Sequence, residues 1–196
     1  MSSPIALVYG HSQSGGMGLD LVSALKTRGY SVVRSTHNGW SDAKLLAGIP
    51  ELGDLSRFSR VYLYGGGNNP APTPDTLLKM VDIFGGPCKV VVVLPPYNAA
   101  KESADVMTDP ATKGWANSRA LEAAGVPCFR AVFAGSDFTD GVHLRAGCAA
   151  SKAFAAEIAA AGCNSGATGD VGGLVLLLAA VGAGVWYWRR RKKRLA

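Results

Sequence analysis

The chain of 196 residues is long enough for one compact domain with an appendage, and 48% of it is hydrophobic, which is enough to fill a core. The formal net charge of +6 is concentrated in residues 189–194, which are all Lys or Arg. Without these six, the 20 basic residues fall to 14, the same as the number of acidic residues. The body of the chain is therefore neutral, which argues against nucleic-acid binding through its own surface.

The first apolar run, residues 5–9, follows a segment without basic residues, which predicts a strand rather than a secretory signal. The four cysteines contain no CxxC pair, so we expect no metal site, and no cofactor is predicted. Cys88 and Cys128 each follow a proline at the start of a predicted strand. Two alternatives stay open for them, buried free thiols or a disulfide between neighbouring strands.

Short apolar runs alternate with helical patterns along the first 161 residues. The predicted strands are residues 5–9, 31–34, 60–64, 89–94 and 129–134. The predicted helices are residues 16–28, 42–55, 74–84, 114–124 and 145–161. This alternation predicts an α/β fold of three layers, α/β/α, around a parallel five-stranded sheet. Right-handed crossovers give the flavodoxin-like strand order 2-1-3-4-5.

Polar residues that suit ester chemistry follow the ends of four predicted strands. Ser12 comes after the first, Gly39 after the second, Asn68 after the third, and Asp140 with His143 after the fifth. Ligands of such sheets bind beyond the carboxyl ends of the strands, so we expect these residues to share one edge. A nucleophilic serine needs a base, a carboxylate that orients it, and donors for an oxyanion. The sequence supplies each type.

Four segments resemble the sequence blocks of the SGNH (GDSL-type) hydrolases. They are VYGHSQS, HNGWSDAKLLAGIPEL, YGGGNN and DGVHL, and the resemblance covers roughly residues 5–160. The resemblance implies a serine esterase in which Ser12 is the nucleophile, His143 the general base and Asp140 its orienting carboxylate. It also implies an oxyanion hole made by the backbone N–H groups of Ser12 and Gly39 and the side chain of Asn68.

The segments depart from the family pattern at two positions, His11 and Asn69, where the family has Asp. Both residues, together with Trp40 and Tyr97, are predicted to line the substrate site, with loop or packing roles as the alternatives. The glycines of YGGGNN are followed by no P-loop lysine, so nucleotide binding is not expected.

The expected function is hydrolysis of a carboxylic ester, with an acylated glycan as the substrate suggested by the family. One alternative is a catalytically silent domain of the same fold that binds a glycan or a partner within a larger assembly. Another is an acyltransferase that uses the same three residues.

The composition changes near residue 164, which predicts four regions. Residues 1–163 form the hydrolase-like domain, 164–170 a flexible linker, 171–188 an uncharged hydrophobic helix, and 189–196 a basic tail. A helix of 18 residues spans roughly 27 Å, enough for a thin bilayer core. The aromatic residues 186–188 at its end are typical of a membrane interface.

The tail leaves several partners open. Residues 171–188 are predicted to be a transmembrane anchor, with docking into an assembly partner as the alternative. The basic run after them suits anionic lipid head groups or nucleic-acid phosphate. We therefore expect a membrane-associated protein, on a side of the membrane that the sequence leaves open. Delivery as a virion component is one route by which the domain reaches the outer side without a cleavable signal.

Overall fold

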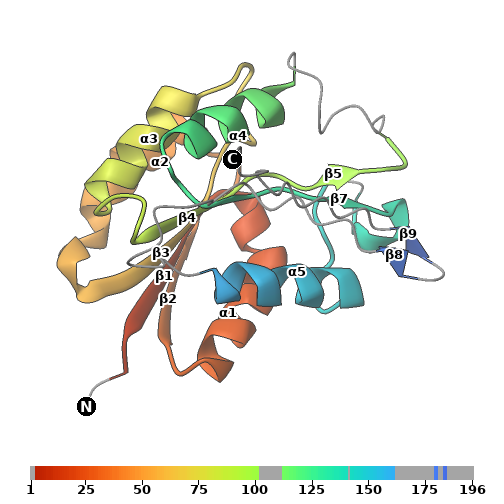
Figure 1. The fold of residues 1–196 in the computed structure, drawn as a ribbon, viewed down its shortest axis with the longest axis horizontal. Coiled ribbons are helices and arrows are strands. Elements are labelled where there is room, and N and C mark those ends of the chain that lie inside the picture. The colour runs from red at the N-terminus through yellow and green to blue at the C-terminus, as the bar shows by residue number, and fades with distance from the viewer. Residues whose placement is uncertain (1–2, 102–111, 141, 162–178, 181–182, 185–196) are drawn as a thin grey trace, which may run out of the picture.

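The computed structural model describes residues 3–101, 112–140, 142–161, 179–180 and 183–184. Its main sheet has five parallel strands in the order β2-β1-β3-β4-β6, which confirms the predicted fold class and strand order (Figure 1). The strands are β1 (Ile5–Gly10), β2 (Ser31–Thr36), β3 (Phe58–Tyr64), β4 (Val90–Val93) and β6 (Cys128–Phe129).

Five helices cover the two faces of the sheet. They are α1 (Met17–Thr27), α2 (Asp42–Gly48), α3 (Pro74–Ile83), α4 (Lys113–Ala123) and α5 (Ala149–Ala160). Helices α1 and α5 lie together on one face, and α2, α3 and α4 on the other (Figure 1). The result is the three-layer arrangement predicted from the alternation of strands and helices.

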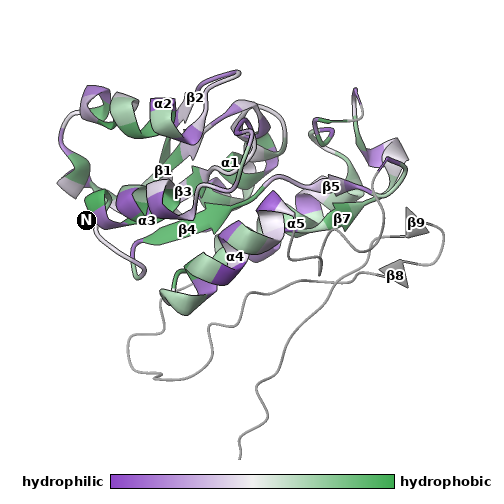
Figure 2. Ribbon diagram, turned by 90° about the horizontal axis from the view of Figure 1, so that it is seen from above, coloured by the Kyte–Doolittle hydropathy of each residue, from purple (hydrophilic) through white to green (hydrophobic). Residues whose placement is uncertain are grey.

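The core consists of two apolar clusters separated by the sheet. Strand β4 contributes to both, because alternate side chains of a strand point to opposite faces. Val91 and Val93 pack with α1 and α5, whereas Val90 and Val92 pack with the helices of the other face. β4 is accordingly hydrophobic along its length (Figure 2). The continuous apolar run is what a strand buried on both sides requires.

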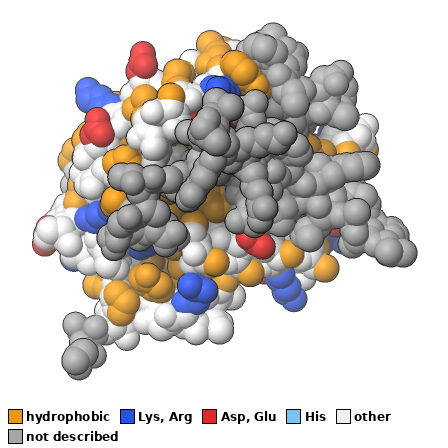
Figure 3. Space-filling model, in the orientation of Figure 1, with side chains coloured by type: hydrophobic (Ala, Val, Ile, Leu, Met, Phe, Trp, Pro, Cys, Tyr) orange, Lys and Arg blue, Asp and Glu red, His pale blue; other side chains and the backbone are white. Residues whose placement is uncertain are grey.

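The outer surface shows no concentration of one charge on the visible face. Lys and Arg side chains lie scattered among acidic and apolar ones there (Figure 3). This agrees with the equal numbers of basic and acidic residues outside 189–194.

Gly10 lets β1 end in a sharp change of direction beside β3. Its φ is +151°, and a Cβ at this position would lie 2.2 Å from the carbonyl oxygen of Tyr64. Any other residue would clash with the β3 backbone. Gly10 pairs with Thr36 of β2 and with Tyr64 of β3, so the three strands end in register at one edge of the sheet.

The predicted fifth strand, 129–134, is divided in two. Its first part pairs with β4, whereas β7 (Val132–Phe133) pairs with β5 (Tyr97–Asn98) in a separate parallel sheet. The division falls opposite Pro95 and Pro96, which have no N–H to donate. The two prolines therefore interrupt a ladder that would otherwise run through both parts.

The helix predicted over 42–55 is also shorter than expected. α2 ends at Gly48, and 3-10 turns follow at Ile49–Leu52 and Leu55–Arg57. Pro50 stands just after the end of α2, where it cannot donate the hydrogen bond that would continue the helix.

The predicted helix over 171–188 is not seen where the structure describes it. Ala179–Ala180 and Ala183–Gly184 form a two-stranded antiparallel pair, β8 and β9. Among the described residues, no helix is both long and apolar enough to cross a membrane. The linker and the basic tail lie outside the described residues.

The two cysteines left open by the sequence do not pair with each other. Cys128 is a buried free thiol, whereas Cys88 is disulfide-bonded. Of the two alternatives, the buried free thiol therefore holds for Cys128 but not for Cys88.

Candidate active site

Ser12 begins a 3-10 turn, Ser12–Ser14, directly after the end of β1. The turn is fixed from within, because the Ser14 hydroxyl donates to the carbonyl of His11 at 2.8 Å and contacts the Thr36 hydroxyl of β2 at 2.9 Å. Ser14 is fully buried. The serine that the sequence singled out thus stands at the carboxyl edge of the sheet on a rigid support.

Asp140 and His143 lie on a loop between β7 and α5. Phe138 and Leu144 close this loop as an antiparallel bridge, and both side chains are buried in the core. The N–H of Thr139 donates to the carbonyl of His143 at 2.8 Å. The loop is therefore anchored at its base while its tip reaches the Ser12 turn.

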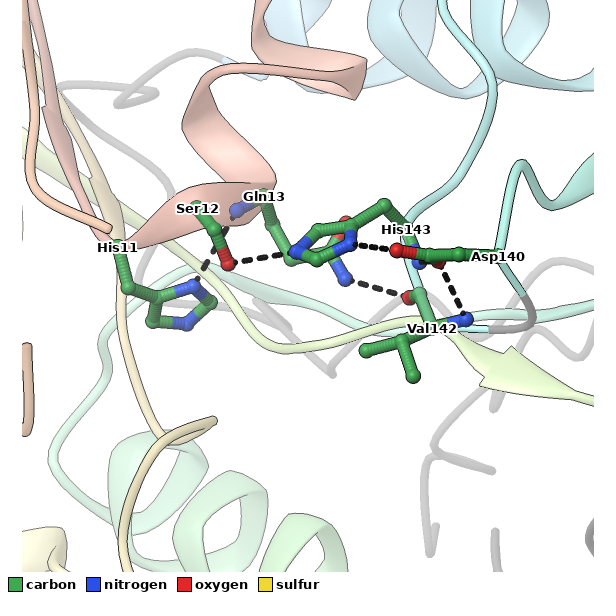
Figure 4. Close-up of polar contacts among 6 residues, drawn as sticks. All are labelled: His11, Ser12, Gln13, Asp140, Val142 and His143. Carbon is green, nitrogen blue, oxygen red and sulfur yellow. Dashed lines mark hydrogen bonds and ion pairs between the residues drawn. The ribbon is translucent and has the colours of Figure 1, made fainter. Parts of the chain in front are cut away.

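A chain of hydrogen bonds joins Ser12 of the nucleophile turn to His143 and Asp140 of this loop (Figure 4). His143 Nε2 lies 2.8 Å from Ser12 Oγ, and His143 Nδ1 lies 2.6 Å from Asp140 Oδ2. An ionised carboxylate can only accept, so Nδ1 carries the proton and Nε2 of the neutral ring is free to accept from the serine. The three residues are brought together as the sequence predicted.

The carboxylate of Asp140 is held ionised by its neighbours. Its Oδ1 accepts the backbone N–H groups of Val142 at 2.9 Å and of His143 at 2.7 Å. The hydrogen bond from the His143 ring, followed by these two backbone bonds, holds the pKa of Asp140 far below its usual range. A permanent negative charge thus faces the side of the imidazole that points away from Ser12.

Asn68 and Gly39, the predicted oxyanion donors, lie on the two loops that flank β1. The Asn68 side chain is exposed, and its Nδ2 donates to the carbonyl of Trp40 at 3.1 Å. An amide nitrogen carries two hydrogens, so one N–H is left for another acceptor. Gly39 stands in an exposed turn after β2 with a φ of +73°, which favours glycine there.

A buried carboxylate that the sequence analysis missed, Asp42, holds the Asn68 loop. Asp42 is fully buried, and its carboxylate accepts the N–H of Gly66 at 3.0 Å, the Asn69 amide at 2.9 Å and the Thr73 hydroxyl at 2.5 Å. Asn69 also accepts the backbone N–H of Asp42 at 3.1 Å. Such a set of donors is what a buried carboxylate needs.

This network explains one departure from the family pattern and corrects one prediction. Asn69 was expected to line the substrate site, but its side chain is buried and bonded to Asp42. Lys113 adds a second tie, with Nζ 2.5 Å from the Asn69 carbonyl oxygen. Asp42 follows Ser41 at the start of a helix, where an acidic residue is ordinary, so its sequence context gave no signal.

The other predicted lining residues differ in their surroundings. His11 is buried, and burial, partly offset by the nearby Asp42 charge, lowers the pKa of its ring. The indole of Trp40 stacks on His37 with 3.9 Å between ring centroids, and it also packs over Gly48. The Tyr97 hydroxyl lies against Gly114 of α4. His11 supports the nucleophile turn, because its Nδ1 accepts the backbone N–H of Gln13 at 3.4 Å.

Among the described residues, no group of three or more His, Cys, Asp or Glu side chains could hold a metal ion.

Comparison with known proteins identifies the fold. No family model and no curated protein matches the sequence. Among solved structures, a lipase/acylhydrolase from Enterococcus faecalis is similar with a TM-score of 0.58 and 16% identity, over 80% of this chain and 93% of that one. A GDSL-like lipase from Bacteroides thetaiotaomicron has a TM-score of 0.51 and 16% identity, over 79% and 84%. An α/β hydrolase enzyme from the Lake Arreo metagenome has a TM-score of 0.51 and 14% identity, over 80% and 92%. The chain thus has the fold of the SGNH (GDSL-type) hydrolases.

Proposed function

We propose that this protein is a serine esterase that cleaves carboxylic esters with Ser12, His143 and Asp140. One observation carries the proposal: a single imidazole lies within hydrogen-bond distance of both the Ser12 hydroxyl and the Asp140 carboxylate. A base must be within about 2.6–3.2 Å of the proton that it removes, and the distance of 2.8 Å meets this requirement. The SGNH-hydrolase fold supports the same class of reaction.

In the first step, Ser12 Oγ attacks the ester carbonyl while His143 Nε2 accepts the hydroxyl proton. The carbonyl π electrons move to oxygen and give a tetrahedral oxyanion. Collapse of this intermediate breaks the bond to the alcohol oxygen, which takes the proton from His143. The acyl group then remains on Ser12, and Asp140 stabilises the imidazolium formed between the two proton transfers.

In the second step, water attacks the acyl-serine while His143 accepts one of its protons. The second tetrahedral intermediate expels Ser12 Oγ, which recovers its proton from His143. The carboxylic acid leaves, and the site returns to its starting state. No proton or electron is left unaccounted for, and no cofactor is required.

The oxyanion of both intermediates is assigned to three donors, the N–H groups of Ser12 and Gly39 and the second amide hydrogen of Asn68. Each donor is worth about 2.7–4 kcal/mol in enzymes of this kind. The buried Asp42 network supports this assignment, because it fixes the loop that carries Asn68.

We further propose that the ester is carried by a bulky alcohol, such as an acylated glycan. In the described chain, the side chains of His143 and Asp140 are 36% and 53% exposed. A base with such access to solvent suits a leaving alcohol whose main body stays outside the protein. Release of acetate from an O-acetylated polysaccharide, compared with its release from the corresponding O-acetylated monosaccharide, tests this point. Equal or higher kcat/KM for the monosaccharide acetate would contradict it.

The catalytic proposal is tested with the full chain and p-nitrophenyl acetate. We expect wild-type protein to hydrolyse this ester and to react with a fluorophosphonate probe at Ser12, and Ser12→Ala to do neither. Folded wild-type protein that is not labelled would favour the silent binding domain instead. Acyl transfer to a sugar acceptor that exceeds hydrolysis would indicate the acyltransferase.

A further inference from the structure

Gln13 occupies a place that the proposed mechanism leaves without a role. It directly follows Ser12, its side chain is only 4% exposed, and its Nε2 donates to the carbonyl of Val142 at 2.7 Å (Figure 4). Val142 directly precedes His143. This side-chain hydrogen bond therefore connects the turn of the nucleophile to the loop of the base in addition to the bond between Ser12 and His143.

The Val142 peptide group is bonded on both sides. Its N–H donates to Asp140 Oδ1 at 2.9 Å, and its carbonyl accepts from Gln13. The rest of this loop is tied to itself and to the core at its base, through the Phe138–Leu144 bridge. Gln13 thus fixes the tip of the loop, where a small shift would lengthen the distance between His143 Nε2 and Ser12 Oγ.

Stability gives no reason for a glutamine at this position. Its Oε1 is buried and has no hydrogen-bond partner among the described residues. A buried carbonyl without a partner costs free energy that an apolar side chain of similar size would avoid. Gln13 gains one hydrogen bond and loses another on folding. Its benefit therefore has to be sought in the alignment of His143 with Ser12 rather than in the stability of the fold.

We infer that Gln13 is a positioning residue that holds His143 in line with Ser12 by binding the Val142 carbonyl. The inference rests on the proposed esterase function. It predicts an unusual combination for removal of the amide: slower catalysis with unchanged or higher thermal stability.

The test compares Gln13→Met with Ser23→Ala in the full chain. Methionine keeps the length of the side chain but cannot donate, whereas Ser23→Ala removes an exposed side-chain bond to the Leu19 carbonyl on α1. For Gln13→Met we expect kcat for p-nitrophenyl acetate and the rate of fluorophosphonate labelling to fall about ten- to a hundredfold, as small misplacements of reacting groups do. KM and Tm should stay near those of wild type, and Ser23→Ala should leave both rates unchanged.

Wild-type rates in Gln13→Met would overturn the inference, as would a loss of rate explained by a lower folded fraction. If Gln13→Met does not fold, Gln13→Leu applies the same criteria, since its side chain is apolar and cannot donate either. Wild-type protein that is not labelled at Ser12 refutes the esterase proposal instead. In that case, the positioning role of Gln13 is tested by the downfield proton resonance of the His143–Asp140 hydrogen bond. Faster exchange of this proton in Gln13→Met supports the role, and an unchanged resonance overturns it.

Discussion

The two halves of the site are held in opposite ways. Asp140 and His143 are themselves partly exposed, on a loop held by backbone hydrogen bonds and by the Gln13 side chain, whereas the Asn68 loop is fixed by the fully buried carboxylate of Asp42. Substitutions in the exposed half should change the rate and leave the fold intact, because little buried contact is lost. Substitutions in the buried half should change both, since an unmet hydrogen bond in the core costs far more than one at the surface.

Replacement of the base should give the largest effect and the clearest separation of rate from stability. We expect His143→Ala to lower kcat by on the order of 10⁴–10⁶, as loss of the base does in other serine hydrolases. The midpoint of urea unfolding should change little, because the imidazole is partly exposed. Steady-state kinetics and denaturation curves measure the two quantities. A large drop in stability would show that the exposed loop contributes more to folding than its contacts indicate.

Removal of the buried Asp42 carboxylate should lower the stability of the protein, in contrast to substitutions in the exposed half of the site. Asp42→Ala leaves the Gly66 N–H, the Asn69 amide and the Thr73 hydroxyl without their acceptor. The expected loss is about 2–4 kcal/mol in the free energy of unfolding, measured by urea denaturation. Asp42→Asn, which keeps one carbonyl acceptor, should lose less. Equal stability of Asp42→Ala and wild type would mean that the network is not needed for folding.

Asn68→Ala tests the point where the two halves meet, since Asn68 is exposed but stands on the buried network. We expect kcat to fall about 10²–10³-fold with little change in KM, as for the loss of one oxyanion donor. The kcat of Asn68→Asp, whose side chain cannot donate when ionised, should fall at least as far. Retention of kcat in both variants would exclude Asn68 as a donor.

The smallest effect should come from the buried imidazole of His11. Burial lowers its pKa below the ordinary value near 6.5, so the fold favours the neutral ring. Stability from this group is therefore present above pH 6.5 and lost as the pH falls from there toward the lower pKa of the folded state. His11→Gln should flatten the pH dependence of the unfolding free energy in that window. The contribution of Asp140 to the pH dependence of the unfolding free energy is separate from that of His11, because a depressed carboxyl pKa affects stability only below about pH 4.

The sequence predicted the parts of the molecule that depend on periodicity and on strand ends. The five strands and their order follow from apolar runs, and the rule that parallel strands end at one edge places Ser12, His143 and Asp140 there, whereas their meeting as a triad was implied by the resemblance to SGNH hydrolases. It could not predict Asp42 or Gln13, because the burial of a polar side chain depends on what packs over it. The division of the fifth strand was likewise hidden, since Pro95 and Pro96 act on a partner that is distant in the sequence.

The interruption at Pro95 and Pro96 has a further consequence for how the protein behaves in concentrated solution. It leaves β6, at the margin of the main sheet, with only two paired residues, directly after Pro127. A margin this short offers few free backbone donors and acceptors to a second molecule, and proline removes one of them. The same prolines that divide the strand therefore limit sheet-to-sheet joining at the β6 edge, whereas the opposite edge is formed by all six residues of β2.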